Sequence, residues 1–305
     1  MKKHILIFIL LSAAIVGCKK DKEQSPAPII VKGCMDTASS NYNPIATEDD
    51  GSCNYLTSSE EKNKMVLLED FTGVQCTYCP KGHRNSESYS AAHPGKIIII
   101  ATQTANPNFG TPYEGEQNLQ TGFAAELESN AKVKSWPGGT INRTIFSNSK
   151  YPIDTTGGMA MLLTNVAWYD AANEISAQKA PLNIGTKTIY DSLSRIVNIT
   201  VETYYTSTIT EDIYLVAAIT ESNIIVKQID LGVQYARYKH HHVLRTYLNT
   251  PWGEKITSPT TIGTRTKRTF AYTVPSNYNS KNCKVVVFVS EFKKNILNAE
   301  EVPLD

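Results

Sequence analysis

Two cysteines separated by two residues, Cys76 and Cys79, lie between a strand-like run and a helix-like stretch. The run at residues 65–68 is continuously apolar, which is typical of a strand buried on both faces. Residues 79–92 have the pattern of a helix, and the His-Pro-Gly sequence at 93–95 is expected to end it. The pair is therefore predicted at the N-terminus of a helix that follows a buried strand, which indicates an α/β fold.

Elements of the same kind continue to about residue 179. A buried strand is predicted at residues 96–101 and another strand at 140–146, and helices are predicted at 117–133 and 158–177. A Trp-Pro-Gly-Gly sequence that contains Pro137 precedes the second of these strands. This order of strands, helices and a proline turn is the one expected of an α/β thioredoxin-like domain, which we assign to residues 64–179.

Beyond residue 179 the periodicity changes to two. Val197, Ile199 and Val201 alternate with polar residues, as in a strand with one buried face. Further strands are predicted at residues 213–219, 238–248, 270–274 and 284–292. About seven short strands with turn residues between them predict an all-β sandwich of immunoglobulin or fibronectin type at residues 180–305.

The N-terminus has the features of an export signal. A basic start precedes an apolar run at residues 5–16, which is too short to span a bilayer. The run ends in Ile15-Val16-Gly17-Cys18, which resembles a lipobox. We expect residues 1–17 to be a lipoprotein signal peptide, Cys18 to carry the lipid that binds the membrane, and residues 18–32 to be a tether. The alternative is an ordinary signal peptide with an incidental cysteine.

Removal of residues 1–17 leaves the chain close to neutral. It takes Lys2 and Lys3 from the 30 basic residues and none of the 29 acidic ones, so 28 basic residues face 29 acidic ones. This balance gives no reason to expect nucleic acid as a partner. Aromatic and β-branched residues are frequent enough to exclude a disordered stalk.

Residues 33–56 contain two further cysteines, Cys34 and Cys53, in a segment rich in Asn, Asp and Gly. The segment resembles a short cysteine-bracketed repeat that is common in secreted Bacteroidetes proteins. The resemblance implies a structural Cys34–Cys53 disulfide, worth about 3 kcal/mol on the chain-entropy model. The side chains of Asp and Asn in this segment have oxygens that suit calcium. The alternative, which their spacing favours, is that they form turns.

The position of the Cys76–Cys79 pair indicates redox chemistry. The N-terminus of a helix carries partial positive charge and free N–H groups, and both favour a thiolate. Cys76 is predicted to be the exposed nucleophile, and Cys79, in the first helical turn, to resolve a mixed disulfide. Two other interpretations remain. One is half of a zinc site, although no second cysteine pair is evident, and the other is a permanent disulfide.

The sequence FTGVQCTYCPKG resembles the active-site segment of bacterial periplasmic disulfide isomerases, which are thioredoxin-like proteins. The resemblance implies that Asp70 is a buried acid that handles the proton of the disulfide. It also implies that Pro137 is the cis-proline that faces the disulfide and docks the substrate. Two departures weigh against general thioredoxin activity, since Gln75 replaces the usual tryptophan and Gly138 follows the proline.

Four sequence segments carry a wider resemblance: LLEDFTGVQCTYCPKG, SWPGGTINR, YKHHHVLRTYL and VVVFVSEF. Over residues 64–305 the chain resembles the Omp-twenty-eight-related outer membrane lipoprotein family of Bacteroidetes. The resemblance implies a location at the outer membrane, on its periplasmic face or at the cell surface. We expect no cofactor.

The remaining candidates are histidines and one cysteine. On a strand, His240 and His242 share one face, but two ligands make a weak metal site, so we predict no metal and an exposed position. His83, one helical turn after Cys79, is expected to be a solvated helix residue. Cys283 is expected to be a half-buried, unreactive thiol.

Two functions follow from these observations. The first is a thiol–disulfide oxidoreductase tethered to the envelope, with protein disulfides or a redox partner as its reactants. The second is a non-catalytic surface lipoprotein whose β-sandwich recognises a protein or a glycan. The cysteine motif favours the first, whereas the departures at Gln75 and after Pro137 favour the second.

Overall fold

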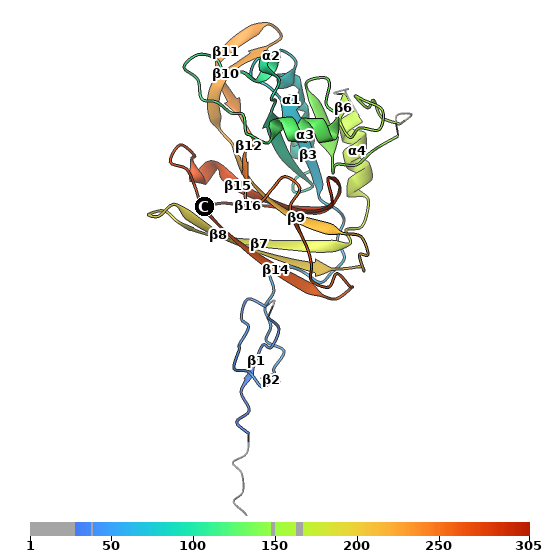
Figure 1. Cartoon of the computed structure of the whole chain (residues 1–305), viewed down its shortest axis with the longest axis vertical. Helices are drawn as coiled ribbons and strands as arrows, with labels where there is room; N and C mark the ends of the chain where they lie inside the picture. The colour runs from blue at the N-terminus through green and yellow to red at the C-terminus, as the bar shows by residue number, and fades with distance from the viewer. Residues whose placement is uncertain (1–27, 38, 148–149, 163–166) are drawn as a thin grey trace, which may run out of the picture.

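A mixed β-sheet runs through the computed structural model (Figure 1), which describes residues 28–37, 39–147, 150–162 and 167–305. Its strands lie in the order β16-β15-β9-β12-β4-β3-β5-β6, and β13 pairs with β9. The bounds are β3 (Val66–Thr72), β4 (Ile97–Gln103), β5 (Gly138–Ile141), β6 (Met161–Leu162), β9 (Ile213–Glu221), β12 (Val243–Tyr247), β13 (Glu254–Lys255), β15 (Cys283–Glu291) and β16 (Lys294–Pro303). The sheet therefore contains strands from both halves of the sequence.

The first half has an α/β arrangement in which β3 is buried on both faces. β3 is parallel to β4 and antiparallel to β5. Leu67 and Phe71 pack into a core with α3 and β15, whereas Val66 and Leu68 pack on the opposite face against α1 and α4. The helices are α1 (Cys79–Ala92), α2 (Pro107–Gly110), α3 (Ala124–Ala131) and α4 (Ala167–Ser176). Burial on both faces explains the continuous apolar run.

The second half packs two sheets face to face. A three-stranded antiparallel sheet has the order β14-β8-β7, with the bounds β7 (Leu182–Asp191), β8 (Ile196–Tyr205) and β14 (Arg265–Thr273). The alternating residues Val197, Ile199 and Val201 point inward and share a core with residues of β9 and β15. The predicted alternation thus marks the buried face of β8.

The two halves share one sheet. β12 pairs with β9 in antiparallel and with β4 in parallel, and Val243 takes part in both pairings. The second half is therefore not a self-contained immunoglobulin-like sandwich, because its central sheet continues into the α/β half. The structure agrees with the predicted fold class only at a coarser level, since the chain is mostly β with few helices. The division at residues 179–180 stays a prediction.

A hairpin leaves the sheet between β9 and β12. It consists of β10 (Ile224–Asp230) and β11 (Val233–His240), which form a separate two-stranded sheet. In Figure 1 it extends to the end of the molecule that holds α1 and α2. The single strand predicted at residues 238–248 is wrong, because the chain turns after β11 and His242 adopts a left-handed φ of 56°.

Two predicted helices are shorter than expected. The first is limited to α3, because Leu119 is buried in a small core and Gln120 donates from its side chain to the carbonyl of Thr104, which holds the preceding segment in a loop. The second is replaced at its start by β6, which pairs with β5. In both cases tertiary contacts outweigh local helical periodicity.

The N-terminal module lies below the three-stranded sheet in Figure 1. It contains the short strands β1 (Lys32–Gly33) and β2 (Glu48–Asp49) and a disulfide between Cys34 and Cys53.

The remaining element is a short 3-10 helix, Ser280–Asn282, which precedes β15. The predicted signal peptide and Cys18 lie outside the described residues. None of the helices in the described part of the chain is long and apolar enough to cross a membrane.

Candidate functional site

The Cys76–Cys79 disulfide lies in the turn between β3 and α1. In this turn the N–H of Cys76 donates to the carbonyl of Gly73, and the N–H of Cys79 donates to that of Cys76. Pro80 fits the first helical turn, since N–H groups there have no intrahelical acceptor. Cys76 is only 2% exposed and Cys79 is fully buried. The predicted exposure of Cys76 is therefore wrong.

Asp70 is a buried carboxyl group on the face of β3 that points towards α1. Burial alone raises its pKa from 3.8 to about 7. Its Oδ1 atom has no hydrogen-bond partner among the described residues. A small pocket lies beside it, bordered also by His83, Glu87 and His242. Asp70 can therefore take up or release a proton near neutral pH.

Pro137 lies beside Asp70 because of the pairing of β5 with β3, in which Gly138 is opposite Phe71 and Gly139 is opposite Asp70. The Trp136–Pro137 peptide bond is cis. A Cβ atom added at Gly82 of α1 would lie 3.1 Å from Cβ of Pro137 and 3.7 Å from Oδ1 of Asp70. The absence of a side chain at Gly82 thus lets α1 approach both residues one helical turn after Cys79.

The β10–β11 hairpin covers the turn that holds the disulfide. The N–H groups of Ile229 and Leu231 donate to the carbonyls of Val74 and Thr77, at 3.1 and 2.9 Å. The buried side chain of Gln228 donates to the carbonyls of Gly73 and Cys76, at 3.1 and 3.2 Å. These contacts, made by backbone N–H groups and by the Gln228 side chain, explain why the turn and its cysteines are shielded from solvent.

Side chains of α1 also contact the hairpin. Arg84 forms an ion pair with Asp230 at 2.7 Å. The imidazole of His83 lies between the hydroxyl groups of Thr72 and Tyr238, each 2.8 Å from a ring nitrogen. Burial, together with nearby His240, lowers the pKa of His83 to about 3. The predicted solvated position of His83 is wrong, because the hairpin packs on this side of α1.

The histidines at 240–242 belong to the same region. His240 is 2% exposed and lies with its ring 6.3 Å from that of His83, so its predicted exposed position is wrong. Burial lowers its pKa to about 4. No cluster of three or more His, Cys, Asp or Glu side chains suited to a metal occurs within the described ranges. Cys283 is a buried free cysteine, and burial raises its pKa to about 12.

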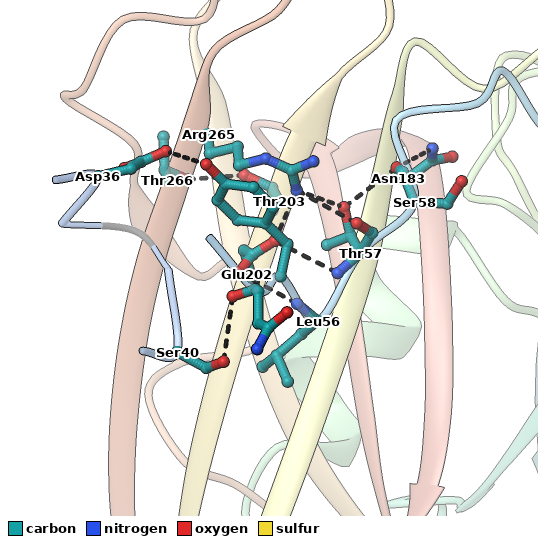
Figure 2. A network of polar contacts seen from close by, with 12 residues as sticks. Asp36, Ser40, Leu56, Thr57, Ser58, Asn183, Glu202, Thr203, Arg265 and Thr266 are labelled. Carbon is teal, nitrogen blue, oxygen red and sulfur yellow. Dashed lines mark hydrogen bonds and ion pairs between the residues drawn. The ribbon is translucent and has the colours of Figure 1, made fainter. Parts of the chain in front are cut away.

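The N-terminal module is held to the three-stranded sheet by a network of polar contacts, which Figure 2 shows. Glu202 accepts hydrogen bonds from the N–H groups of Leu56 and Thr57 and forms an ion pair with Arg265 at 2.6 Å. The guanidinium of Arg265 lies 3.7 Å from the centre of the Tyr55 ring. The chain that leaves the module is thereby fixed on β8 and β14.

The Asn and Asp side chains whose oxygens suit calcium make contacts inside the module. The Oδ1 atoms of Asn43, Asp49 and Asp50 each accept a hydrogen bond from the N–H two residues further along the chain. Asn41 accepts from the N–H of Asn54. The first three contacts are those of turns, in which Asn and Asp side chains bind nearby backbone, whereas the contact of Asn41 joins two ends of the module.

Comparison with known proteins identifies the family. A family model described as outer membrane protein Omp28 matches residues 124–304, which is more than half of the chain. The chain belongs to the Omp28 family. The predicted location at the outer membrane is thereby confirmed. The Omp28 match includes Pro137 and the hairpin but begins after Cys79, so the cysteine pair lies outside it.

Solved structures resemble this Omp28 family member at low sequence identity. HBP35 of Porphyromonas gingivalis is 16% identical over 80% of this chain and 76% of that chain, with a TM-score of 0.58. A domain of the outer membrane lipoprotein Omp28 from Porphyromonas gingivalis is 17% identical over 41% of this chain and 89% of that chain, with a TM-score of 0.30. The likeness to HBP35 concerns the fold alone. No curated protein matches the sequence.

The structure thus brings Asp70 and Pro137 to the helix that begins at Cys79, and it keeps Cys34 and Cys53 in a separate module. The hairpin residues that cover the site, in particular Gln228 and Asp230, were not predicted. Their side chains contact residues about 150 positions away in the sequence, and local patterns carry no signal for such contacts.

Proposed function

We propose that this Omp28 family member carries out thiol–disulfide exchange on polypeptides of the cell envelope, with residues 64–179 as a thioredoxin-like domain. The observation that carries the proposal is the buried Asp70, whose pKa is raised to about 7, on the strand that leads into the Cys76–Cys79 turn. A carboxyl group without an ion pair is costly to bury. Such groups concentrate at sites that transfer protons.

The reaction is a reversible exchange of two electrons and two protons. In the direction of substrate reduction, the Cys76 thiolate attacks a substrate disulfide, one substrate sulfur leaves as a thiolate, and a mixed disulfide forms. The Cys79 thiol then transfers its proton to the Asp70 carboxylate and attacks the sulfur of Cys76. This releases the second substrate thiolate and forms the Cys76–Cys79 disulfide. An envelope dithiol donates the electrons for the next cycle.

Three features support these roles. The N-terminus of α1 favours a thiolate at the cysteine pair. The raised pKa of Asp70 lets it accept a proton near pH 7, where a general base works best. Substrate docking is assigned to Pro137, which follows a cis peptide bond and lies next to Gly82 and Asp70. A lipid on Cys18 would hold the enzyme at the membrane, within reach of other anchored proteins.

The first test is the reduction potential of the Cys76–Cys79 pair. The protein would be the mature chain with Cys18→Ser, equilibrated with glutathione buffers. A potential above about −270 mV, within the range of exchange proteins, supports catalysis, and a potential below about −300 mV marks a structural disulfide. Cys79→Ser should accumulate mixed disulfides with envelope polypeptides, whereas Cys76→Ser, the matched control, should not.

The second candidate function is a non-catalytic binding or structural lipoprotein. The observation that favours it is the 2% exposure of Cys76, since a nucleophile must reach its substrate. Under this alternative the disulfide only stabilises the turn, and Cys76→Ser leaves every interaction of the protein with its partner unchanged. Pull-down of envelope proteins or glycans with Cys76→Ser and with the unmodified chain distinguishes the two functions.

A further inference from the structure

The β10–β11 hairpin is attached to the rest of the fold in a way that suits movement. Its two strands pair only with each other in the described part of the chain. Each end of the hairpin has a residue in the left-handed region, Asn223 with φ 61° and His242 with φ 56°. The backbone therefore breaks away from the main sheet at both ends of the hairpin.

The base and the tip of the hairpin are held differently. At the base, Ile224 and Val226 are buried in an apolar cluster with Val74 and Leu119. At the tip, residues 228–232 are held by polar contacts to the cysteine turn and α1. Apolar burial fixes the base, whereas the tip is held by hydrogen bonds and a partly exposed ion pair, each of which contributes only modestly to the net stability.

The tip contacts the cysteine turn through backbone N–H groups. Ile229, in β10, and Leu231, in the turn that follows β10 with a left-handed φ of 48°, donate to the carbonyls of Val74 and Thr77. The N–H groups of another polypeptide segment can take the place of these donors. Gly232 adds a third N–H, which donates to Oγ1 of Thr77 at 2.8 Å.

We infer that the tip of the hairpin, residues 228–232, is a gate that occupies the cysteine turn and must move away before an extended, cysteine-bearing polypeptide can react with Cys76. This inference rests on the proposed exchange function and adds a substrate class and a specificity element to it. The gate protects the disulfide from folded proteins that cannot displace the tip. A flexible segment can replace the N–H donors of Ile229 and Leu231 with its own.

The test weakens the gate without changing any residue of α1, the cysteine turn or Asp70. Asp230→Asn removes the ion pair with Arg84, and Gln228→Leu removes the side-chain bonds to Gly73 and Cys76 at similar volume. The matched control is Asp212→Asn, which removes an ion pair with Lys255 at 2.6 Å far from the gate, on the β13 side of β9. All variants are made in the mature chain with Cys18→Ser.

The measurement is the rate constant of the reduced protein with two probes, oxidised glutathione and insulin. We expect Asp230→Asn to raise the rate with insulin by about two- to fivefold and Gln228→Leu by about tenfold. Asp212→Asn should leave it unchanged. Because the gate acts on access, the reduction potential of the gate variants should remain that of the unmodified protein.

The outcomes separate the gate from the exchange function. If the unmodified protein exchanges with insulin and both gate variants do so at the same rate, the gate is disproved and the exchange function stands. If no variant reacts with either probe, the exchange function fails and the gate fails with it. Should Gln228→Leu unfold the protein, Asp230→Asn and hydrogen exchange at the amides of Ile229 and Leu231 still decide. Exchange as slow as in β9 would contradict an opening tip.

Discussion

The two faces of β3 carry two buried carboxyl groups, on adjacent residues, in opposite electrostatic settings. Glu69 points towards the second half and accepts three hydrogen bonds from the guanidinium of Arg143, at 2.7–3.2 Å, and one from Thr140. Asp70 points towards α1. Among the described residues it forms no ion pair, and its Oδ1 atom accepts no hydrogen bond. Strand geometry, which alternates side chains between faces, separates them.

The Glu69 face is built to keep a charge. The Nη1 group of Arg143, which does not bind Glu69, donates to the carbonyl of Pro251. The guanidinium lies about 5 Å from the ring centres of Trp252 and Phe288. Every charged group there has a partner, as a buried ion pair requires. The Asp70 face is built to keep a proton, because burial without a partner raises the pKa of the carboxyl group to about 7. The first arrangement stabilises the fold, and the second is available for chemistry.

The largest expected effect tests the Glu69 face. Glu69→Gln leaves the charge of Arg143 buried without a counter-charge, so we expect the free energy of unfolding to fall by about 3–5 kcal/mol. Urea unfolding at pH 7 measures this change, with Asp70→Asn as the matched carboxyl-to-amide control on the opposite face. A loss below 1 kcal/mol for Glu69→Gln would mean that the two faces do not differ as described.

The next largest effect is that of Asp70→Asn, which should raise the free energy of unfolding instead of lowering it. The folded pKa of Asp70 is raised from 3.8 to about 7. Between these values the folded state holds a proton that the unfolded state has lost, so unmodified protein loses stability as pH rises through this window. Asp70→Asn removes this loss. At about 1.4 kcal/mol per pH unit, the variant should be more stable by up to about 4 kcal/mol at pH 8 and no more stable at pH 3.

Urea unfolding of Asp70→Asn and unmodified protein across pH 3–8 checks this prediction. Equal stability gains at both ends of the range would show that the effect comes from packing rather than from titration. The same variant should slow the resolution of a mixed disulfide by Cys79, since the base for its proton is lost. A variant that is more stable and slower is the signature of a residue retained for chemistry.

The sequence predicts β3 and α1, the two elements that hold Asp70 and the cysteine pair, well. The helix at Cys79–Ala92 has the predicted bounds, and the strand that leads into it is where the apolar run indicated. Both follow from local rules, because a continuous apolar run and a Pro in the first turn act within a few residues. The cis peptide bond before Pro137 agrees with the resemblance, and the pairing of β5 with β3 brings this residue beside Asp70.

The β10–β11 hairpin, which covers the cysteine turn, could not be predicted. Two of the hydrogen bonds from the hairpin to the cysteine turn join backbone N–H and carbonyl groups, which carry no information on residue type. The side-chain contacts of Gln228 and Asp230 join residues about 150 positions apart, which local patterns do not relate. Likewise, the joint pairing of β12 with β9 and β4 depends on the register of strands far apart in the sequence. The left-handed conformation of His242, which ends the predicted strand, is uncommon for a non-glycine residue.

The smallest effect concerns a chain of neutral hydrogen bonds on the Asp70 face. Thr72, which points to the same side of β3 as Asp70, contacts His83, and His83 contacts the hydroxyl of Tyr238 on the hairpin. The pKa of His83 is lowered to about 3 and that of Tyr238 is raised to about 12, in both cases mainly by burial. Both groups are therefore uncharged between pH 7 and pH 9.

Tyr238→Phe removes one neutral hydrogen bond from this chain, so we expect it to lower the free energy of unfolding by about 0.5–1.5 kcal/mol. Because neither partner titrates between pH 7 and pH 9, the loss should be the same at both values, unlike the pH-dependent gain of Asp70→Asn. Urea unfolding at the two pH values measures it. A loss above 3 kcal/mol, or one that changes between pH 7 and pH 9, would require a buried charge in contact with Tyr238. The Asp70 face would then resemble the Glu69 face, in which charges are held in pairs, and Asp70 would no longer stand out as the proton carrier of β3.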